Sequence, residues 1–479
     1  MEKCTLQVNY ISPRKNEGDL CISLLSAAAT RFTIGDYITL RMFITPRHRR
    51  DALGNFSHFS LFTQTDSVVM CMCMCICYIH GIYREITLSL LYLYIYIRLI
   101  RHNWTDQAVK GELVPGFFFD LFIIIVRGRT MSSKETRLSE DEIALYDRQI
   151  RLWGMAAQLN MRNARVLLIN LGSVGAEVAK NVVLSGIGHF CILDDGDHVV
   201  DEHDLRSSFL FSREDLGKSR LEACKARVHA LNPLVDLTTD SDSLSLKTPE
   251  YFGKFDLIVG TELSRTQLLR VNKISRNLNI PLYVAGSNGL FAYIFVDLIE
   301  FESIETKLKS NLSTPLGKSS PGREIIDVTT YKDEADGKGK LFERLTVRNT
   351  FRPMEEILEN ASLESTLNKR QLKRVSNILP LTLATLSIES GLGSDLSLED
   401  LKQVAVSFCE KLKIPTTSLD DTYVEQFHKQ RGLEFPPVSA IIGGTIAQDV
   451  INILGKKQSP INNFVVFDGI TLEMPIFEL

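Results

Sequence analysis

Residues 164–199 read ARVLLINLGSVGAEVAKNVVLSGIGHFCILDDGDHV and show the pattern strand, glycine turn, helix, strand. The apolar runs at 166–169 and 190–193 lack helical spacing, which favours two short strands. The valines between these runs recur at helical spacing, and two glycines, Gly186 and Gly188, end the helix. The stretch therefore predicts a βαβ unit of a parallel sheet, whose strands are buried on both faces.

The glycine turn resembles the nucleotide-binding motif G-x-G-x-x-G, but its first glycine is replaced by Asn170, while Gly172 and Gly175 are present. The first glycine normally permits a tight turn, and the second lets the backbone approach a pyrophosphate. Asp194 and Asp195 end the second strand about 20 residues on, where a ribose-binding carboxylate belongs. The motif leaves two possibilities open: a working nucleotide site, or a retained fold whose site no longer works.

Length, charge and cysteine usage exclude several classes of function. The chain has 479 residues and a net charge of -4. This length suggests two to four domains, and the charge lacks the basic signature of nucleic-acid binding, so no nucleic-acid partner is expected. After residue 131 the cysteines form no C-x-x-C pair. A structural zinc site is therefore not expected there, and scattered cysteines suit a reducing compartment.

Residues 1–130 differ from the rest of the chain in their pattern of residue types. Residues 68–78 read VVMCMCMCICY and residues 90–97 read LLYLYIYI. Alternating cysteine and methionine is what a TG/TA dinucleotide repeat gives on translation. We therefore expect residues 1–130 to be translated non-coding sequence or a disordered extension, with Met131 as the true start. Their apolar runs are shorter than the ~20 residues of a membrane helix, so no membrane partner is expected.

Residues 139–153 predict a helix. Ser139 and Glu142 fit a capping box at its start. Arg148 lies among its polar residues, and a solvated polar face beside a buried stripe is the plain interpretation. The predicted buried stripe consists of residues at helical spacing: Ile143, Tyr146, Ile150 and Trp153.

The segment YDRQIRLWG at 146–154, followed by the βαβ unit, resembles the start of the adenylating domain of ubiquitin-type activating enzymes, the E1 family. The resemblance covers nearly all of 131–479. It implies an α/β fold, with a Rossmann-like doubly wound sheet of ThiF/MoeB/E1 type at 131–300 and 438–479. It also implies a mainly helical insertion at 301–437. Further matches follow in the family's order at 209–233, 255–261, 279–298, 435–454 and 462–469.

The insertion contains two kinds of pattern. Residues 306–324 contain prolines and glycine and predict an exposed loop, and residues 327–339 predict a charged, mobile segment. Pro353 predicts the start of a helix. Residues 381–386 and 404–412 predict further helices. A basic cluster favours a solvated helix face over a nuclear-import patch: Lys369, Arg370, Lys373 and Arg374.

The positions at which active E1 members hold nucleotide and magnesium differ in this chain. The arginine of the family motif S-N-L-N-R-Q-F falls on Ser207, and a family lysine falls on Arg220, which keeps the charge but changes the geometry. The magnesium-binding aspartate falls on Leu263, which cannot bind magnesium. Cys409 is interpreted as core, so the thioester cysteine is missing. Together with Asn170, these changes imply no cofactor or metal site in this chain and no complete active site, with ATP and Mg²⁺ in a partner subunit.

The chain thus resembles the non-catalytic half of a heterodimeric E1, whose partner subunit carries the catalytic cysteine. In that family the arginine of the Y-x-R-Q segment reaches the partner's ATP site. Here it is Arg148, the one candidate catalytic residue, acting in trans. The closing segments and the length from Met131 favour the SUMO-type half over the NEDD8-type half. The resemblance therefore predicts a subunit that supports SUMO activation in protein sumoylation, located in the nucleus, with a cytoplasmic pool as the alternative.

Other functions stay open from the sequence. A stand-alone ThiF/MoeB-like adenylyltransferase would need the phosphate arginine and magnesium aspartate that Ser207 and Leu263 replace. A dehydrogenase would need an intact dinucleotide turn and a catalytic acid or base. A regulatory subunit of NEDD8 activation is the near alternative, and a purely structural scaffold is possible if Arg148 has no role.

Overall fold

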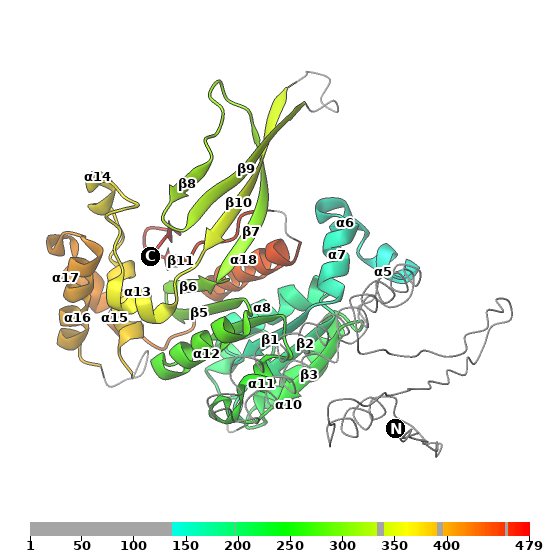
Figure 1. The fold of residues 1–479 in the computed structure, drawn as a ribbon. Helices are drawn as coiled ribbons and strands as arrows, with labels where there is room; N and C mark the ends of the chain where they lie inside the picture. The colour runs from blue at the N-terminus through cyan, green and yellow to red at the C-terminus, as the bar shows by residue number, and fades with distance from the viewer. Residues whose placement is uncertain (1–136, 197, 333–339, 390–395, 456–457) are drawn as a thin grey trace, which may run out of the picture. The chain divides into compact units, whose positions relative to one another are not determined.

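The computed structural model describes residues 137–196, 198–332, 340–389, 396–455 and 458–479. All of them lie in one compact unit, Met131–Leu479, so the predictions for residues 1–130 fall outside the described residues. The core is an eight-stranded sheet with the order β12-β11-β6-β5-β4-β1-β2-β3 (Figure 1). Its strands are β1 Arg165–Ile169, β2 His189–Leu193, β3 Asp236–Asp240, β4 Leu257–Thr261, β5 Leu282–Asn288, β6 Phe291–Asp297, β11 Phe464–Asp468 and β12 Ile476–Phe477.

The predicted βαβ unit is confirmed: β1 is followed by helix α8 (Ser173–Leu184) and then by β2, parallel to β1. Strands β3, β2, β1, β4 and β5 are parallel, and β6, β11 and β12 run antiparallel to their neighbours. The strand order reverses at β1. Helix α8 packs on one face and helix α12 (Arg265–Leu278), which follows β4, packs on the other. In doubly wound folds, ligands bind at the carboxyl ends of the strands on either side of such a reversal, here β1 and β4, and this region is called the crevice below.

Each face of the sheet carries its own hydrophobic core. Helix α18 (Pro436–Gly455) packs against α8 and is long and apolar enough to span a membrane by length and composition, while half of its apolar window is buried inside the fold. Helix α10 (Arg220–Leu231) shares this face, and the helices between residues 354 and 429 cover the other. The remaining bounds are α9 Asp204–Ser207, α11 Pro249–Phe252, η1 Arg213–Asp215 and η2 Leu244–Leu246.

The helix predicted at 139–153 is broken into two short helices, α5 (Glu140–Leu145) and α6 (Asp147–Trp153), and α7 (Met155–Arg162) follows them. The capping box of Ser139 and Glu142 is confirmed. Of the predicted buried stripe, Tyr146 is buried and Ile150 and Trp153 are half-buried, whereas Ile143 is exposed. The break has a physical cause, since the Tyr146 ring fills the space beside Gly186 and its hydroxyl accepts a hydrogen bond from Asn232 Nδ2 at 2.8 Å.

The first part of the insertion is a second sheet, with the order β7-β10-β9-β8, so the loop predicted at 306–324 is wrong in part. The loop is present at 309–316, but β7 (Glu300–Leu308) ends inside the predicted range, β8 (Gly317–Ser320) lies within it, and β9 begins at Arg323. The charged segment from 327 belongs to β9 as far as Lys332, and residues 333–339 lie outside the description. The strands are paired along β10, and the sheet has a small core and surface ion pairs, such as Arg348 with Glu302 at 2.8 Å, which fits its polar sequence. The strands are β7 Glu300–Leu308, β8 Gly317–Ser320, β9 Arg323–Lys332 and β10 Leu341–Thr350.

The helices predicted after residue 353 are confirmed, beginning with Pro353 at the N-cap of α13. The basic cluster that begins at Lys369 is exposed on and after α14. In Figure 1 these helices lie together at one side of the main sheet. They are α13 Met354–Asn360, α14 Lys369–Leu372, α15 Ile378–Ser387, α16 Leu398–Leu412, η3 Thr416–Ser418 and α17 Asp421–Lys429.

Candidate functional site

Asn170 keeps the tight turn after β1 even though it replaces a glycine. Its φ of 65° is left-handed, a conformation that asparagine tolerates better than most residues. The Asn170 side-chain amide donates to the Thr261 carbonyl at 2.8 Å, and the Thr261 hydroxyl donates to the Asn170 carbonyl at 2.9 Å. Gly175 is required here, because a Cβ would lie 2.6 Å from the Asn170 carbonyl oxygen. The substitution therefore preserves the backbone path and ties the end of β1 to the end of β4.

A carboxylate lies where the glycine turn meets α8. The backbone N–H of Ser173, the first residue of α8, donates to Glu434 Oε1 at 2.9 Å. Gly172 leaves the space for this contact, since a Cβ there would lie 2.5 Å from the same oxygen. His203 Nδ1 lies 3.9 Å from Glu434 Oε2. The N-terminus of α8, where a helix favours an anion, is thus occupied by a side chain of this chain.

A second carboxylate, Glu262, follows β4 on the other side of the crevice. Its Oε1 accepts hydrogen bonds from the Ser287 backbone N–H at 2.7 Å and from the Ser287 hydroxyl at 3.2 Å. Burial, and then the negative charge of Glu434, raise the pKa of Glu262 to about 8. The next residue, Leu263, is only 6% exposed and packs into the core beside Gly260. The crevice is therefore acidic and apolar where a nucleotide site needs cations and a metal ligand.

A Glu262→Gln variant tests this electrostatic description. A carboxyl whose pKa is higher in the folded state than in the unfolded state binds protons on folding, so its contribution to stability is lost as pH rises from about 4.5 through 8. Glutamine keeps an oxygen that can accept from Ser287 and never ionises. We expect the variant to become more stable relative to wild type as pH rises, by on the order of 2 kcal/mol at pH 9. Denaturant unfolding of both proteins between pH 5 and 9 measures this difference.

Glu425→Gln is the matched control for that measurement, because Glu425 is exposed and, among the described residues, pairs with Lys429 at the helix surface. Its stability relative to wild type should be nearly constant over the same pH range. A wild-type protein whose stability does not fall relative to Glu262→Gln above pH 7 would contradict the raised pKa.

The two other substituted positions, Arg220 and Ser207, do not offer an unpaired positive charge to a phosphate. Arg220 forms a two-point ion pair with Asp204, at 2.8 Å from Nη2 to Oδ1 and 3.0 Å from Nε to Oδ2, and the Asp204 side chain is only 2% exposed. Ser207 is buried, and its carbonyl accepts from the Ser173 hydroxyl at 2.7 Å. The structure thus brings Asn170, Ser207 and Leu263 to one crevice, while the charge of Arg220 is neutralised by Asp204.

Asp194 lies at the end of β2, as the motif predicts, and is buried. Its Oδ1 lies 2.9 Å from His198 Nδ1, and its Oδ2 has no hydrogen-bond partner among the described residues. Within the same part of the chain, no three His, Cys, Asp or Glu side chains gather as a metal cluster. With Leu263 at the magnesium position and Glu434 at the helix N-terminus, the residues present do not fit a Mg²⁺–ATP complex.

Arg148 lies on α6, is exposed, and has no hydrogen bond or ion pair within the described residues. Arg151, one turn further along the same helix, pairs with Asp147 at 3.0 Å. Cys409 is 1% exposed inside α16, which confirms its interpretation as a core residue. Arg148, the candidate catalytic residue predicted from the sequence, is therefore exposed and has no partner in the part of the chain that the structure describes.

The comparisons with known proteins agree with the fold and with the order of motifs. The sequence profile of the ThiF family matches residues 146–479, which is more than half of the chain. The chain belongs to the ThiF family. Its eight-stranded mixed sheet with helices on both faces is the α/β, Rossmann-like fold expected from that membership.

Relatives of this ThiF-family chain are named either DNA damage tolerance protein or SUMO-activating enzyme subunit 1. It is 55% identical over 351 residues to the DNA damage tolerance protein RHC31 of Saccharomyces cerevisiae, covering 73% of this chain and 100% of the relative. It is 32% identical over 338 residues to SUMO-activating enzyme subunit 1 of Homo sapiens, covering 69% and 93%. It is 31% identical over 344 residues to the protein of the same name from Xenopus laevis, covering 71% and 96%.

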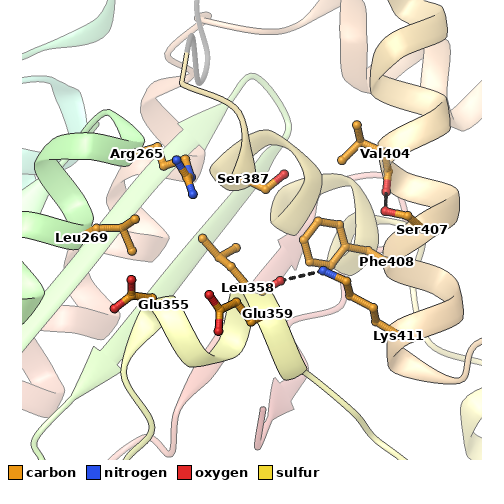
Figure 2. Close-up of a pocket in the computed structure, with 10 residues that line it drawn as sticks. All are labelled: Arg265, Leu269, Glu355, Leu358, Glu359, Ser387, Val404, Ser407, Phe408 and Lys411. Carbon is orange, nitrogen blue, oxygen red and sulfur yellow. Dashed lines mark hydrogen bonds between the residues drawn. The ribbon is translucent and has the colours of Figure 1, made fainter.

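The ThiF-family chain also has a cavity of about 330 Å³ away from the glycine turn, between α12, α13, α15 and α16 (Figure 2). Figure 2 shows Lys411 beside the Phe408 ring with its Nζ donating to the Leu358 carbonyl, at 2.9 Å. Ser407 bonds back to its own helix, and Arg265 Nε has no partner in the part of the chain described. The cavity mixes both signs of charge, and its Ser387 and Ser407 hydroxyls and Lys411 amine donate to backbone carbonyls, so we keep the candidate site at the crevice.

The sequence predictions missed both carboxylates of the crevice. Glu262 follows β4 directly and stands beside Leu263, so its position after a strand of the parallel sheet was a usable signal. Glu434 lies 261 residues from Ser173, and no local pattern links the two positions. Its role follows only from the fold of this ThiF-family chain.

Proposed function

We propose that this chain is the non-catalytic, regulatory subunit of a heterodimeric SUMO-activating enzyme. In this role it supports ATP-dependent adenylation of SUMO, and thioester formation, by a cysteine-bearing partner subunit. Its relatives named SUMO-activating enzyme subunit 1 support the modifier and the subunit type. The observation that carries the proposal is the contrast between an exposed Arg148, which pairs with no described residue, and a crevice filled by Glu434, Glu262 and Leu263.

The crevice argues against adenylation by this chain alone. Attack on the α-phosphate of ATP develops negative charge, which active sites stabilise with backbone amides, cations and a metal ion. Here the first amide of α8 already binds Glu434, and Arg220 is neutralised by Asp204. Leu263 cannot bind magnesium. We therefore place ATP and Mg²⁺ in the partner subunit, and SUMO as the substrate of the complex.

Arg148 has the chemistry and the surroundings of a residue that acts across a subunit interface. A guanidinium is always charged and matches phosphate oxygens in geometry. Leu145, Leu152 and Met155, on the helices around it, are exposed apolar residues, and Leu152 is 73% exposed. Exposed apolar residues beside an exposed arginine suit a protein interface. We propose that Arg148 contacts the nucleotide phosphates in the partner's site.

ATP–pyrophosphate exchange with purified SUMO tests this function. We expect no exchange with the full chain alone and exchange after the cysteine-bearing subunit is added, because each subunit then supplies the part the other lacks. NEDD8 in place of SUMO should give little exchange with the same mixture. Exchange by the chain alone would show that Asn170, Ser207 and Leu263 are compensated and would refute the regulatory role. Location in the nucleus stays a prediction, which imaging of the tagged chain would test.

A further inference from the structure

The contact between Glu434 and the start of α8 has the features of a ligand contact. The Ser173 N–H is among the first amides of a 12-residue helix, which have no partner within the helix itself. In a nucleotide-binding turn these amides face the pyrophosphate. Here the Ser173 N–H donates to Glu434 Oε1 at 2.9 Å, and the Glu434 side chain is 14% exposed. A carboxylate of the chain therefore takes the place and the charge of a phosphate oxygen.

Glu434 is held in place by its own segment of chain. The Gly289 N–H donates to the Leu433 carbonyl at 2.7 Å, and the Leu290 N–H donates to Gln430 Oε1 at 2.8 Å. Gly289 has a φ of 62°, and a Cβ there would lie 2.3 Å from Gln430 Oε1. The segment before α18 is thus fastened to the turn between β5 and β6. Glu434 reaches the crevice from a fixed backbone.

We propose that Glu434 is a built-in anion that replaces the nucleotide phosphate at the N-terminus of α8 and closes the degenerate nucleotide site from within the chain. A polyphosphate entering this site would have to displace Glu434 and would then face the carboxyl group of Glu262, with Leu263 in place of a metal ligand. The site therefore has no need of a nucleotide to neutralise the helix terminus. This inference depends on the geometry of the chain alone and stands apart from its role in SUMO activation.

Chemical rescue tests the proposal on the full chain without a partner. Glu434→Ala removes the anion and leaves the space, so its unfolding midpoint should fall by about 2 to 4 °C, as for the loss of a helix cap. Inorganic phosphate should raise the midpoint of this variant relative to sodium chloride at the same ionic strength. Wild type should show no such difference, because Glu434 already fills the position. Mg²⁺–ATP should leave the wild-type midpoint unchanged.

Two further variants complete the test. Glu434→Gln keeps an accepting oxygen in the same position, so phosphate should not stabilise it. Glu434→Ser, with a short hydroxyl that leaves the space open, replaces Glu434→Ala if that variant does not fold, and should respond to phosphate. A Glu434→Ala midpoint equal to that of wild type would overturn the proposal. Equal stabilisation of wild type and Glu434→Ala by phosphate, or stabilisation of wild type by Mg²⁺–ATP, would overturn it as well.

Discussion

An Arg148→Ala variant of this chain, assembled with the cysteine-bearing subunit, should lower the rate of ATP–pyrophosphate exchange with SUMO by about 100-fold. The size of the effect is that of removing one donor aimed at the charge of a transition state. Arg148 is exposed and pairs with no described residue, so its loss should leave the stability of the chain within about 0.5 kcal/mol of wild type. Exchange rates at saturating SUMO, together with the unfolding midpoint of the isolated variant, measure both effects.

Arg151→Ala is the matched control, because Arg151 lies on the same helix and already pairs with Asp147. An exposed pair of this kind contributes little, so the control should exchange at nearly the wild-type rate. Arg148→Lys should recover only part of the activity, since an ammonium keeps the charge but loses the two-point geometry. Equal exchange rates for Arg148→Ala and Arg151→Ala would remove Arg148 from the partner's site.

The sequence was sufficient for the parts of the fold that local pattern dictates. The βαβ unit at β1, α8 and β2 is confirmed because buried parallel strands read as apolar runs and the helix between them has its own period. The pattern failed at 306–324, where parts of a small, polar sheet were predicted as loop. With a core of only a few apolar residues, such a sheet lacks the alternation that marks a half-buried strand.

The residues of the candidate site likewise differ in whether the sequence could predict them. Asn170, Ser207 and Leu263 could be singled out because each stands in a recognisable motif, and the structure brings all three to one crevice. The role of Glu434 could not be predicted, because it depends on how the segment before α18 packs across the sheet. The sequence could thus indicate what the nucleotide site lacks, and only the fold shows which group fills it.

Gly443→Ala should destabilise the chain by about 2 to 3 kcal/mol, whereas Gly444→Ala should be neutral or stabilise it by up to about 1 kcal/mol. Both glycines lie in α18, so the substitution and the helix propensity are matched. A Cβ at Gly443 would lie 2.5 Å from the Cβ of Glu177 on α8 and would force the helices apart, which costs energy as overpacking does. A Cβ at Gly444 meets nothing within 4 Å.

The effect of Gly443→Ala should extend to the crevice, because α8 begins at Ser173 and α18 begins two residues after Glu434. Separating the two helices should lengthen the hydrogen bond from the Ser173 N–H to Glu434 Oε1. The Gly443→Ala variant should therefore also be stabilised by inorganic phosphate, whereas Gly444→Ala should not. Guanidinium unfolding with and without phosphate measures both quantities. Equal unfolding free energies for the two variants would mean that α18 and α8 are not in close contact at Gly443, and the geometry that places Glu434 against α8 would have to be revised.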